Sequence, residues 1–205
     1  MTPADWLHGR WIHPRRVRVL AARAAALVPP GAELLDVGCG DGLIAREITR
    51  HRPDIRVRGI DVLVRSASVI PVSEFDGRRI PFASRSVDTI TLFDVLHHAD
   101  DPQMLLAEAA RVARAQVLIK DHICESTFDG ALLRFMDDVG NERHGVARPH
   151  RYWSLQQWTD ATQTLGLTWE VRDIGGLGLY PWPASLLFGR SLHLLACLKV
   201  ANSHG

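Results

Sequence analysis

The stretch LLDVGCGDG, residues 34–42, is the most informative segment of this chain for its fold class. It places Asp36 at the end of an apolar strand pattern, and glycines follow at positions 38, 40 and 42 before the helical pattern LIAREITR begins. Glycines let the backbone turn tightly and approach a ligand, and the first turn of a helix offers unpaired N–H groups. The stretch therefore predicts a strand–loop–helix unit that binds a nucleotide-like cofactor.

Outward from this loop, short apolar runs alternate with helical patterns. The apolar runs are ELLDV, IRVRGID, VDTITLFDV, AQVLIKD, LTWEVRDIG and LHLLACLKV, and the helical patterns between them include LIAREITRH and PQMLLAEAARVA. Strands separated by helices of this length are typical of βαβ units, which form a parallel sheet with both faces covered. We therefore predict an α/β fold.

Two features of the loop argue against a dinucleotide cofactor. The fingerprint GxGxxG requires glycine at the position of Leu43, and the carboxylate of Asp41 would lie where pyrophosphate oxygens bind. Acids inside and just before the loop instead suit a cofactor with a cationic amino acid portion and no phosphate. S-adenosylmethionine has that chemistry, and we predict it as the cofactor.

Two further acids follow at the ends of later strand patterns. Asp61 comes about twenty residues beyond the loop, where a carboxylate can accept both hydroxyls of a ribose. Asp76 follows the third strand and could accept the adenine amino group, with Gly77 allowing close approach. Either acid could instead serve an ordinary turn, and Asp-Gly is a common turn pair. The combination of both acids with the glycine loop favours the cofactor.

The segments LLDVGCGDG, GID and FDGRRIPFASRSVDTITLFDVLHHADDPQMLLAEAARV resemble the class I S-adenosylmethionine-dependent methyltransferases, in particular the group with small-molecule substrates. The resemblance covers residues 30–120 most strongly and is specific as a set. It implies that the glycine loop binds the methionine end, that the acids bind ribose and adenine, and that the end of strand four faces the sulfonium. The implied cofactor-binding residues are Asp36, Gly38, Cys39, Gly40, Asp61, Val62, Asp76, Gly77, Phe93, Asp94 and His97.

The chain departs from the family pattern in two places. Residues 62–75 are shorter than the usual helix and third strand, which implies a more open adenine side. The usual Pro-Gly-Gly loop before strand five is also missing, which implies a tighter connection at that point.

The resemblance also implies the arrangement of the whole chain. We expect a three-layer α/β/α, Rossmann-like methyltransferase fold with a mostly parallel seven-stranded sheet and an antiparallel last strand. Residues 1–205 form a single methyltransferase domain in this interpretation. Helical periodicity predicts an N-terminal helical extension over residues 1–30 that ends at a Pro-Pro pair. Residues 122–153 are interpreted as a lid inserted after strand five, helical from Ser126 to Val139.

Candidate catalytic residues follow strands four and five, because open α/β sheets bind ligands at the carboxyl ends of their strands. His97 and His98 come after strand four, and Asp121 and His122 come after strand five. We predict His122 as a base for the acceptor and His98 as a second candidate. Asp121 would orient His122 or a neighbouring group, whereas His97 could simply pack beneath the cofactor.

Composition and charge limit the classes of function. A formal net charge of +1 over 205 residues excludes the strong positive field of a dedicated nucleic-acid binder. Three separated cysteines form no disulfide framework and indicate a reducing, cytoplasmic location, and the sequence predicts neither a secretory signal nor a membrane span. No metal site is predicted, because His144 and His150 alone do not supply the ligands that zinc requires.

The sequence therefore predicts methyl transfer from S-adenosylmethionine to a small-molecule acceptor. Oxygen is the expected acceptor atom because histidines lie near the expected sulfonium position, with nitrogen and carbon as alternatives. Two other interpretations stay open. The shortened adenine side suggests a non-catalytic cofactor-binding or interaction module, and the basic first helix suggests an RNA or protein methyltransferase. An oligomeric state is not predicted.

Overall fold

A computed structural model describes residues 8–141 and 149–201 of the chain. Its elements in chain order are η1 (His8–Ile12), α2 (His13–Leu27), β1 (Glu33–Val37), α3 (Leu43–His51), β2 (Arg56–Asp61), β3 (Val72–Glu74), β4 (Val87–Phe93), η2 (Leu96–His98), α4 (Pro102–Val112), β5 (Ala113–His122), α5 (Thr127–Asn141), α6 (Leu155–Thr164), β6 (Thr168–Ile174), α7 (Ser185–Phe188) and β7 (His193–Lys199). Parts of the expected N-terminal extension and of the expected lid, residues 1–7 and 142–148, lie outside the described residues.

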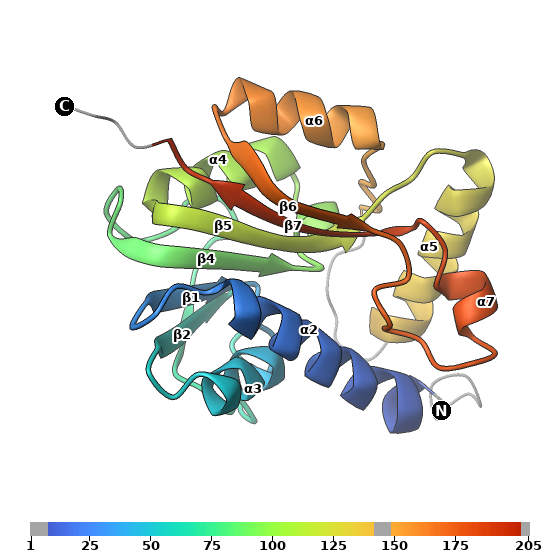
Figure 1. Cartoon of the computed structure of the whole chain (residues 1–205), viewed down its shortest axis with the longest axis horizontal. Coiled ribbons are helices and arrows are strands. Elements are labelled where there is room, and N and C mark those ends of the chain that lie inside the picture. The colour runs from blue at the N-terminus through green and yellow to red at the C-terminus, as the bar shows by residue number, and fades with distance from the viewer. Residues whose placement is uncertain (1–7, 142–148, 202–205) are drawn as a thin grey trace.

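The strands within the described residues form one seven-stranded sheet in the order β3-β2-β1-β4-β5-β7-β6 (Figure 1). β1 to β5 pair in parallel, whereas β7 runs antiparallel to both of its neighbours, β5 and β6. The predicted α/β class, the mostly parallel sheet and the antiparallel last strand are therefore confirmed. β3 has only three residues and follows β2 without a helix between them, in agreement with the short segment noted in the sequence.

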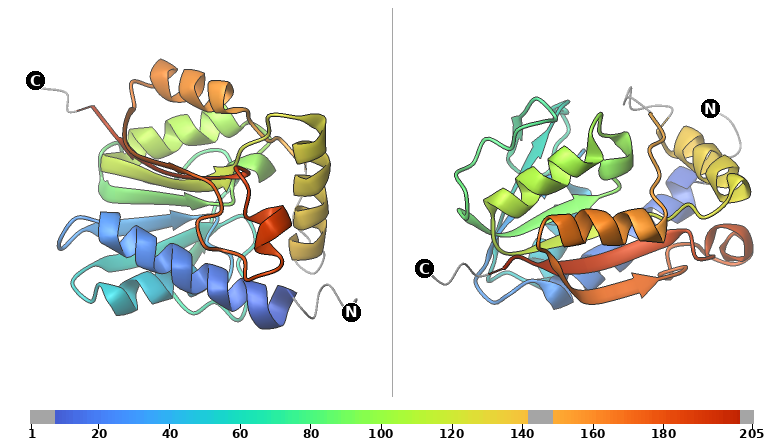
Figure 2. Two further views of the ribbon diagram at one scale, coloured as in Figure 1. Left: turned by 45° about the vertical axis from the view of Figure 1, so that its right-hand side comes forward. Right: turned by 90° about the horizontal axis from the view of Figure 1, so that it is seen from above.

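Helices cover both faces of this sheet. α2 and α3 lie on one face, and α4 and α6 lie on the other (Figures 1 and 2). On the first face Ala24 of α2 and Ile48 of α3 belong to one apolar cluster, and on the second face Leu106 of α4 and Trp158 of α6 belong to another. Fully burying a large apolar side chain contributes about 1.5–3 kcal/mol, so these two interfaces hold the three layers together.

Two helices begin with side-chain caps that the sequence encodes locally. Asp101 accepts a hydrogen bond from the backbone N–H of Met104 at the start of α4. Ser154 and Gln157 form a reciprocal capping box at the start of α6. Such caps contribute about 0.5–2 kcal/mol each. Within the described ranges, no helix combines the length and apolar character that crossing a bilayer would require.

The strand order creates a topological switch point at the carboxyl edge of the sheet, and we call this region the crevice. The chain moves outward from β1 to β2 and β3 and then returns, so that β4 lies on the other side of β1. Open α/β sheets bind ligands beyond the carboxyl ends of strands at such a switch point. α5 and α7 lie beyond the end of β5 in both ribbon views (Figures 1 and 2), and Phe135 of α5 stacks on Phe188 of α7. The crevice is therefore the place to look for a site.

Candidate active site

The loop between β1 and α3 has a backbone conformation that requires glycine. Gly38, Gly40 and Gly42 have φ angles of 70°, 59° and 78°, in the left-handed region. A Cβ atom at Gly38 would lie 2.6 Å from a methyl group of Val95, so a larger residue would not fit. The N–H of Gly38 donates to the carbonyl of Ile60 at 2.8 Å. The loop is thus a tight turn held at the switch point between β1 and β4.

Asp61, at the end of β2, faces this loop. One of its carboxylate oxygens accepts the N–H of Gly40 at 2.7 Å, and the other accepts the N–H of Leu63 at 2.9 Å. A carboxylate can accept about four hydrogen bonds, so Asp61 retains the capacity to bind the hydroxyls of a ribose. Its position fits the role predicted from the sequence, and it also fastens the loop to β2.

Asp36 and Cys39 lie on either side of the first glycine of the loop. Burial raises the pKa of the Asp36 carboxyl to about 7, and one of its oxygens accepts the hydroxyl of Thr91 at 2.6 Å. A nearby ammonium group would favour the ionised form of this carboxyl, which suits the methionine end of the expected cofactor. Cys39 lies so close to Gly59 that a Cβ there would be 2.4 Å from its Sγ. Burial raises the pKa of the Cys39 thiol, which stays protonated.

Asp76 and Gly77 lie at the outer end of the crevice, after β3. The Asp76 carboxylate accepts the backbone N–H groups of Arg79 and Arg78 at 2.7 and 2.8 Å, which lowers its pKa. Gly77 has a φ of 74°, and a Cβ there would lie 3.0 Å from a methyl of Val62. Asp76 therefore serves its own turn, while one oxygen is left to accept an adenine amino group. It also borders a cleft of about 710 Å³.

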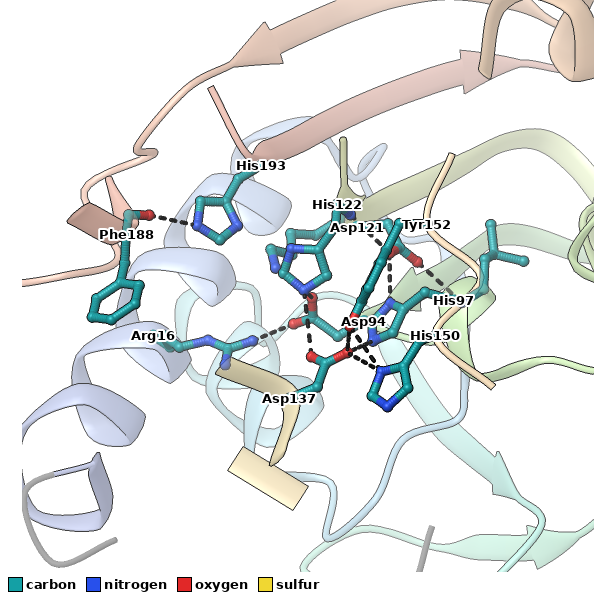
Figure 3. Close-up of polar contacts among 12 residues, drawn as sticks. Arg16, Asp94, His97, Asp121, His122, Asp137, His150, Tyr152, Phe188 and His193 are labelled. Atoms are coloured by element: carbon teal, nitrogen blue, oxygen red, sulfur yellow. Dashed lines mark hydrogen bonds and ion pairs between the residues drawn. The ribbon is translucent and has the colours of Figure 1, made fainter. Parts of the chain in front are cut away.

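A second group of polar side chains lies largely buried beyond the ends of β4 and β5 (Figure 3). It brings together residues from α2, from the carboxyl ends of β4 and β5, from α5, from the segment before α6 and from β7. We call this group the polar cluster; its members are Arg16, Asp94, His97, Lys120, Asp121, His122, Asp137, His150, Tyr152 and His193.

Asp94 lies between two cations in this cluster. Arg16 of α2 donates to one of its oxygens and Lys120 of β5 donates to the other. The Lys120 side chain has no exposed surface. Burial alone would raise the pKa of Asp94, but Lys120 and Arg16 hold it well below its usual range. Asp94 has a φ of 57°, in the left-handed region that residues other than glycine adopt uncommonly.

His97 and Asp121 form a buried hydrogen-bonded pair. Nδ1 of His97 lies 2.6 Å from Oδ1 of Asp121, and both side chains are 2% exposed. Asp121 also accepts the backbone N–H groups of Leu96 and His122 at 3.0 and 2.7 Å. Burial disfavours a charged imidazole, but the Asp121 carboxylate outweighs it and raises the pKa of His97. Nε2 of His97 has no hydrogen-bond partner among the described residues.

His122 directs its Nε2 toward two carboxylates. That nitrogen lies 3.5 Å from Oδ1 of Asp94 and 3.8 Å from Oδ1 of Asp137. Burial, with the positive charge of Lys120, holds the pKa of His122 well below its usual value, so the ring is neutral at pH 7. Asp137 on α5 lies 3.5 Å from Nε2 of His97 and accepts the hydroxyl of Tyr152. α5 thus brings a carboxylate to the cluster from outside the sheet.

The structure brings the predicted catalytic residues His98, Asp121 and His122 close together, but the histidine that pairs with Asp121 is His97. Asp121 accepts a hydrogen bond from the ring of the neighbouring His97 and not from the ring of His122. His98 is only partly buried, with its ring centroid 4.0 Å from that of His97. Phe93, predicted at the cofactor, belongs to the apolar cluster between the sheet and the helices α2 and α3.

Arg16, Lys120 and His193 are cluster members that the sequence analysis did not select. A lysine inside the buried run AQVLIKD is a usable signal, because a fully buried lysine nearly always has a charged partner. Nothing in the sequence distinguishes Arg16, since it is one of several arginines in a helical pattern that predicts a basic, exposed face. Its partner Asp94 is 78 positions away in the chain.

His193 predicts an acid sensitivity of the folded state. It has no exposed surface, its Nε2 contacts the carbonyl of Phe188 at 2.8 Å, and burial lowers its pKa to about 3. The unfolded chain binds a proton there near pH 6.5, so acidification below that pH favours unfolding by up to about 1.4 kcal/mol per pH unit. Above pH 6.5 His193 contributes no pH dependence. We expect His193→Gln to show a shallower loss of stability between pH 6 and 4 in urea unfolding experiments.

The matched control is His51→Gln, because His51 is exposed on α3. This variant should lose stability with the same slope as the unmodified chain. Parallel slopes for His193→Gln and the unmodified chain would contradict the assignment of acid sensitivity to His193.

The fold and the crevice together define a class of protein. A sheet with an antiparallel β7 between β5 and β6, a glycine loop after β1 and an acid after β2 are features typical of the cofactor-binding half of class I methyltransferases. Comparison with known proteins agrees, since residues 35–119 match the family described as a methyltransferase domain.

Individual relatives give the same result at low identity. The chain is 32% identical over 115 residues to a ubiquinone biosynthesis O-methyltransferase of Hahella chejuensis, which covers 50% of this chain and 46% of that protein. It is 25% identical over 173 residues to the protein of that name from Pectobacterium carotovorum, covering 74% and 69%. A solved SAM-dependent methyltransferase of Aquifex aeolicus shares the fold, with a TM-score of 0.62, 16% identity and 96% and 98% of the two chains covered.

These matches support a class I S-adenosylmethionine-dependent methyltransferase, and S-adenosylmethionine is the cofactor that they imply. The chain spans about half the length of the first of these relatives. The residues at the switch point are compatible with that cofactor, because the loop needs its glycines and the carboxyls of Asp36 and Asp61 lie next to it.

Proposed function

We propose that this chain transfers the methyl group of S-adenosylmethionine to an oxygen atom of a small-molecule acceptor. Two relatives are named as O-methyltransferases of ubiquinone biosynthesis, which supports oxygen as the acceptor atom. The observation that carries the proposal is the polar cluster, which lies beside the crevice at the ends of β4 and β5.

Five residues would hold the cofactor. Asp36 faces the amino acid portion, Gly38 and Gly40 allow the backbone to approach it, Asp61 binds the ribose and Asp76 accepts from the adenine. When bound, the cofactor supplies a methyl group on a positively charged sulfur. Transfer of that group is an in-line displacement, so alignment of donor and acceptor is the main task of the protein.

An oxygen acceptor adds a second task, because a hydroxyl must lose its proton. The cluster is suited to this, since His97 and His122 direct ring nitrogens toward carboxylates in a space from which water is largely excluded. Asp121 would stabilise a positive charge on His97. A nitrogen acceptor that is already deprotonated would not need these residues. We also propose that α5 acts as a lid, because Asp137 reaches the cluster from this helix.

Transfer of a labelled methyl group tests the proposal. The full chain is incubated with methyl-labelled S-adenosylmethionine and matched pairs of small acceptors, phenols and carboxylic acids against the corresponding amines. Label is expected in the oxygen acceptors. Asp121→Asn should slow the transfer by about 100-fold or more, because His97 loses its charged hydrogen-bond partner. Transfer to amines alone, or none to any member of the set, would contradict an oxygen acceptor.

A further inference from the structure

We propose that Asp94, His97, His122 and Asp137 form a binding site for one divalent transition-metal ion, with zinc as the first ion to test. Asp94, His97 and His122 each offer a ligand atom, and these atoms lie within 4.8 Å of one another. His97 belongs to a second such group together with His98 and Asp137. His97 is thus common to both groups, and Figure 3 shows its contact with Asp137 of α5.

Three contacts in the cluster have the lengths expected between neighbouring ligands of one ion. They join Nε2 of His97 to Oδ2 of Asp137 at 3.5 Å, and Nε2 of His122 to Oδ1 of Asp94 at 3.5 Å and to Oδ1 of Asp137 at 3.8 Å. Hydrogen bonds between nitrogen and oxygen are about 2.7–3.2 Å long, so these contacts are too long for that role. Ligands about 2.0–2.1 Å from a tetrahedral zinc lie about 3.3 Å from one another.

The proposed ligands are held by a second layer of contacts. Nδ1 of His97 pairs with Asp121, which leaves Nε2 directed into the site, buried and without a hydrogen-bond partner among the described residues. Asp137 accepts the hydroxyl of Tyr152, and Asp94 is fixed by Lys120. Metal-binding histidines usually donate their other nitrogen to a carboxylate or carbonyl, and metal-binding carboxylates are themselves hydrogen-bonded. His97, Asp94 and Asp137 have this organisation, whereas Nδ1 of His122 has no hydrogen-bond partner among the described residues.

The charge of the cluster allows a cation despite the two basic residues. Asp94, Asp121 and Asp137 are three carboxylates, whereas Arg16 and Lys120 are the permanent cations among the described members. With neutral imidazoles these three carboxylates and two cations together have a net negative charge. Arg16 and Lys120 both bind Asp94, and Arg16 also lies near enough to Asp137 to interact with its carboxylate.

The donor atoms also select the kind of ion. Two imidazoles and two carboxylates suit zinc or a neighbouring transition metal, whereas magnesium prefers oxygen ligands alone. Among these ligands only Asp94 and His97 are close in the chain, whereas His122 and Asp137 come from β5 and α5, so no ligand motif of set spacing marks the site in the sequence. Binding of the ion does not depend on the proposed function. Its use does: with the ion bound, Nε2 of His97 and of His122 would be ligands and not proton acceptors, and the ion would instead make a hydroxyl that binds to it more acidic.

The test is a titration of the full chain with zinc chloride after treatment with EDTA, without cofactor or acceptor. Calorimetry should show one ion per chain, and the midpoint of thermal unfolding should rise with zinc. His97→Gln and Asp137→Asn should each weaken the affinity by about 100-fold or more, and Asp121→Asn by about 10- to 100-fold. His51→Gln, on the exposed face of α3, should bind as the unmodified chain does.

Two results would overturn the proposal. One is the absence of stoichiometric zinc binding by the unmodified chain. The other is zinc binding that survives in His97→Gln and Asp137→Asn but is lost in His51→Gln, which would place the ion on surface histidines. Visible absorption of the Co²⁺-loaded unmodified chain, typical of four-coordinate cobalt with nitrogen and oxygen ligands, supports the site even where a variant fails to fold. The zinc titration and the cobalt spectrum need neither cofactor nor acceptor. They therefore test the metal site even if the chain transfers no methyl group to oxygen.

Discussion

Asp94→Ala is expected to lower the free energy of unfolding by about 3–5 kcal/mol, because removal of one partner from a buried ionic group leaves uncompensated charge. Asp94 is the common partner of Arg16 and Lys120, and Lys120 has no exposed surface. Without the carboxylate, two cations would face each other inside the protein. Urea unfolding at pH 7 in the presence of EDTA measures the effect without any contribution from a bound ion.

The matched control for Asp94→Ala is Asp173→Ala. Asp173 pairs with Arg23 of the same helix α2, but these two side chains are 42% and 39% exposed. Exposed ion pairs contribute about 0–1 kcal/mol, so this variant should remain close to the unmodified chain. If both substitutions have equal effects, the polar cluster does not stabilise the fold in the way described above.

Asp61→Ala should weaken the binding of S-adenosylhomocysteine, the demethylated cofactor, by about 100-fold or more. Hydrogen bonds to a charged group contribute about 1.5–3 kcal/mol each, and the ribose hydroxyls would lose two of them. The substitution also removes the acceptor of the Gly40 N–H, which holds the glycine loop in place. Calorimetric titration of each purified variant measures the change.

Asp160→Ala on α6 provides the matched control, since Asp160 is an exposed carboxylate that contacts Gln156 on the same helix. Its affinity for S-adenosylhomocysteine should be unchanged. Unfolding midpoints of both variants separate a loss of binding from a loss of folding. An Asp61→Ala chain that is folded and binds the compound normally would show that the ribose is held elsewhere.

The sheet and its helices could be predicted because their signals are local and repeated. The glycine loop after Asp36, the alternation of strand and helix patterns and the turn glycines each report on a few neighbouring residues. α3 covers the run LIAREITRH, and the Ser154 cap lies directly before its helix. Asp61 could be found in the same way, because its distance from the loop follows from one helix and one strand.

The polar cluster could be predicted only in part because its contacts join distant parts of the chain. His97, Asp121 and His122 were accessible, since each follows a strand that ends at the crevice. The partner of each histidine could not be predicted, because Asp121 at the end of β5 contacts the ring of His97, which follows the neighbouring strand β4. Arg16 and Asp137 reach the cluster from helices that lie before and after the matched domain. Only the packing of α2 and α5 at the carboxyl edge of the sheet brings them there.

The central claim is that the turn after Asp36 and the carboxylate of Asp61 bind S-adenosylmethionine. Calorimetric titration of the unmodified full chain with S-adenosylhomocysteine tests it most directly. We predict saturable binding at one site per chain, with a Kd between about 1 µM and 1 mM. An absence of binding at millimolar concentration to the folded chain would contradict the claim.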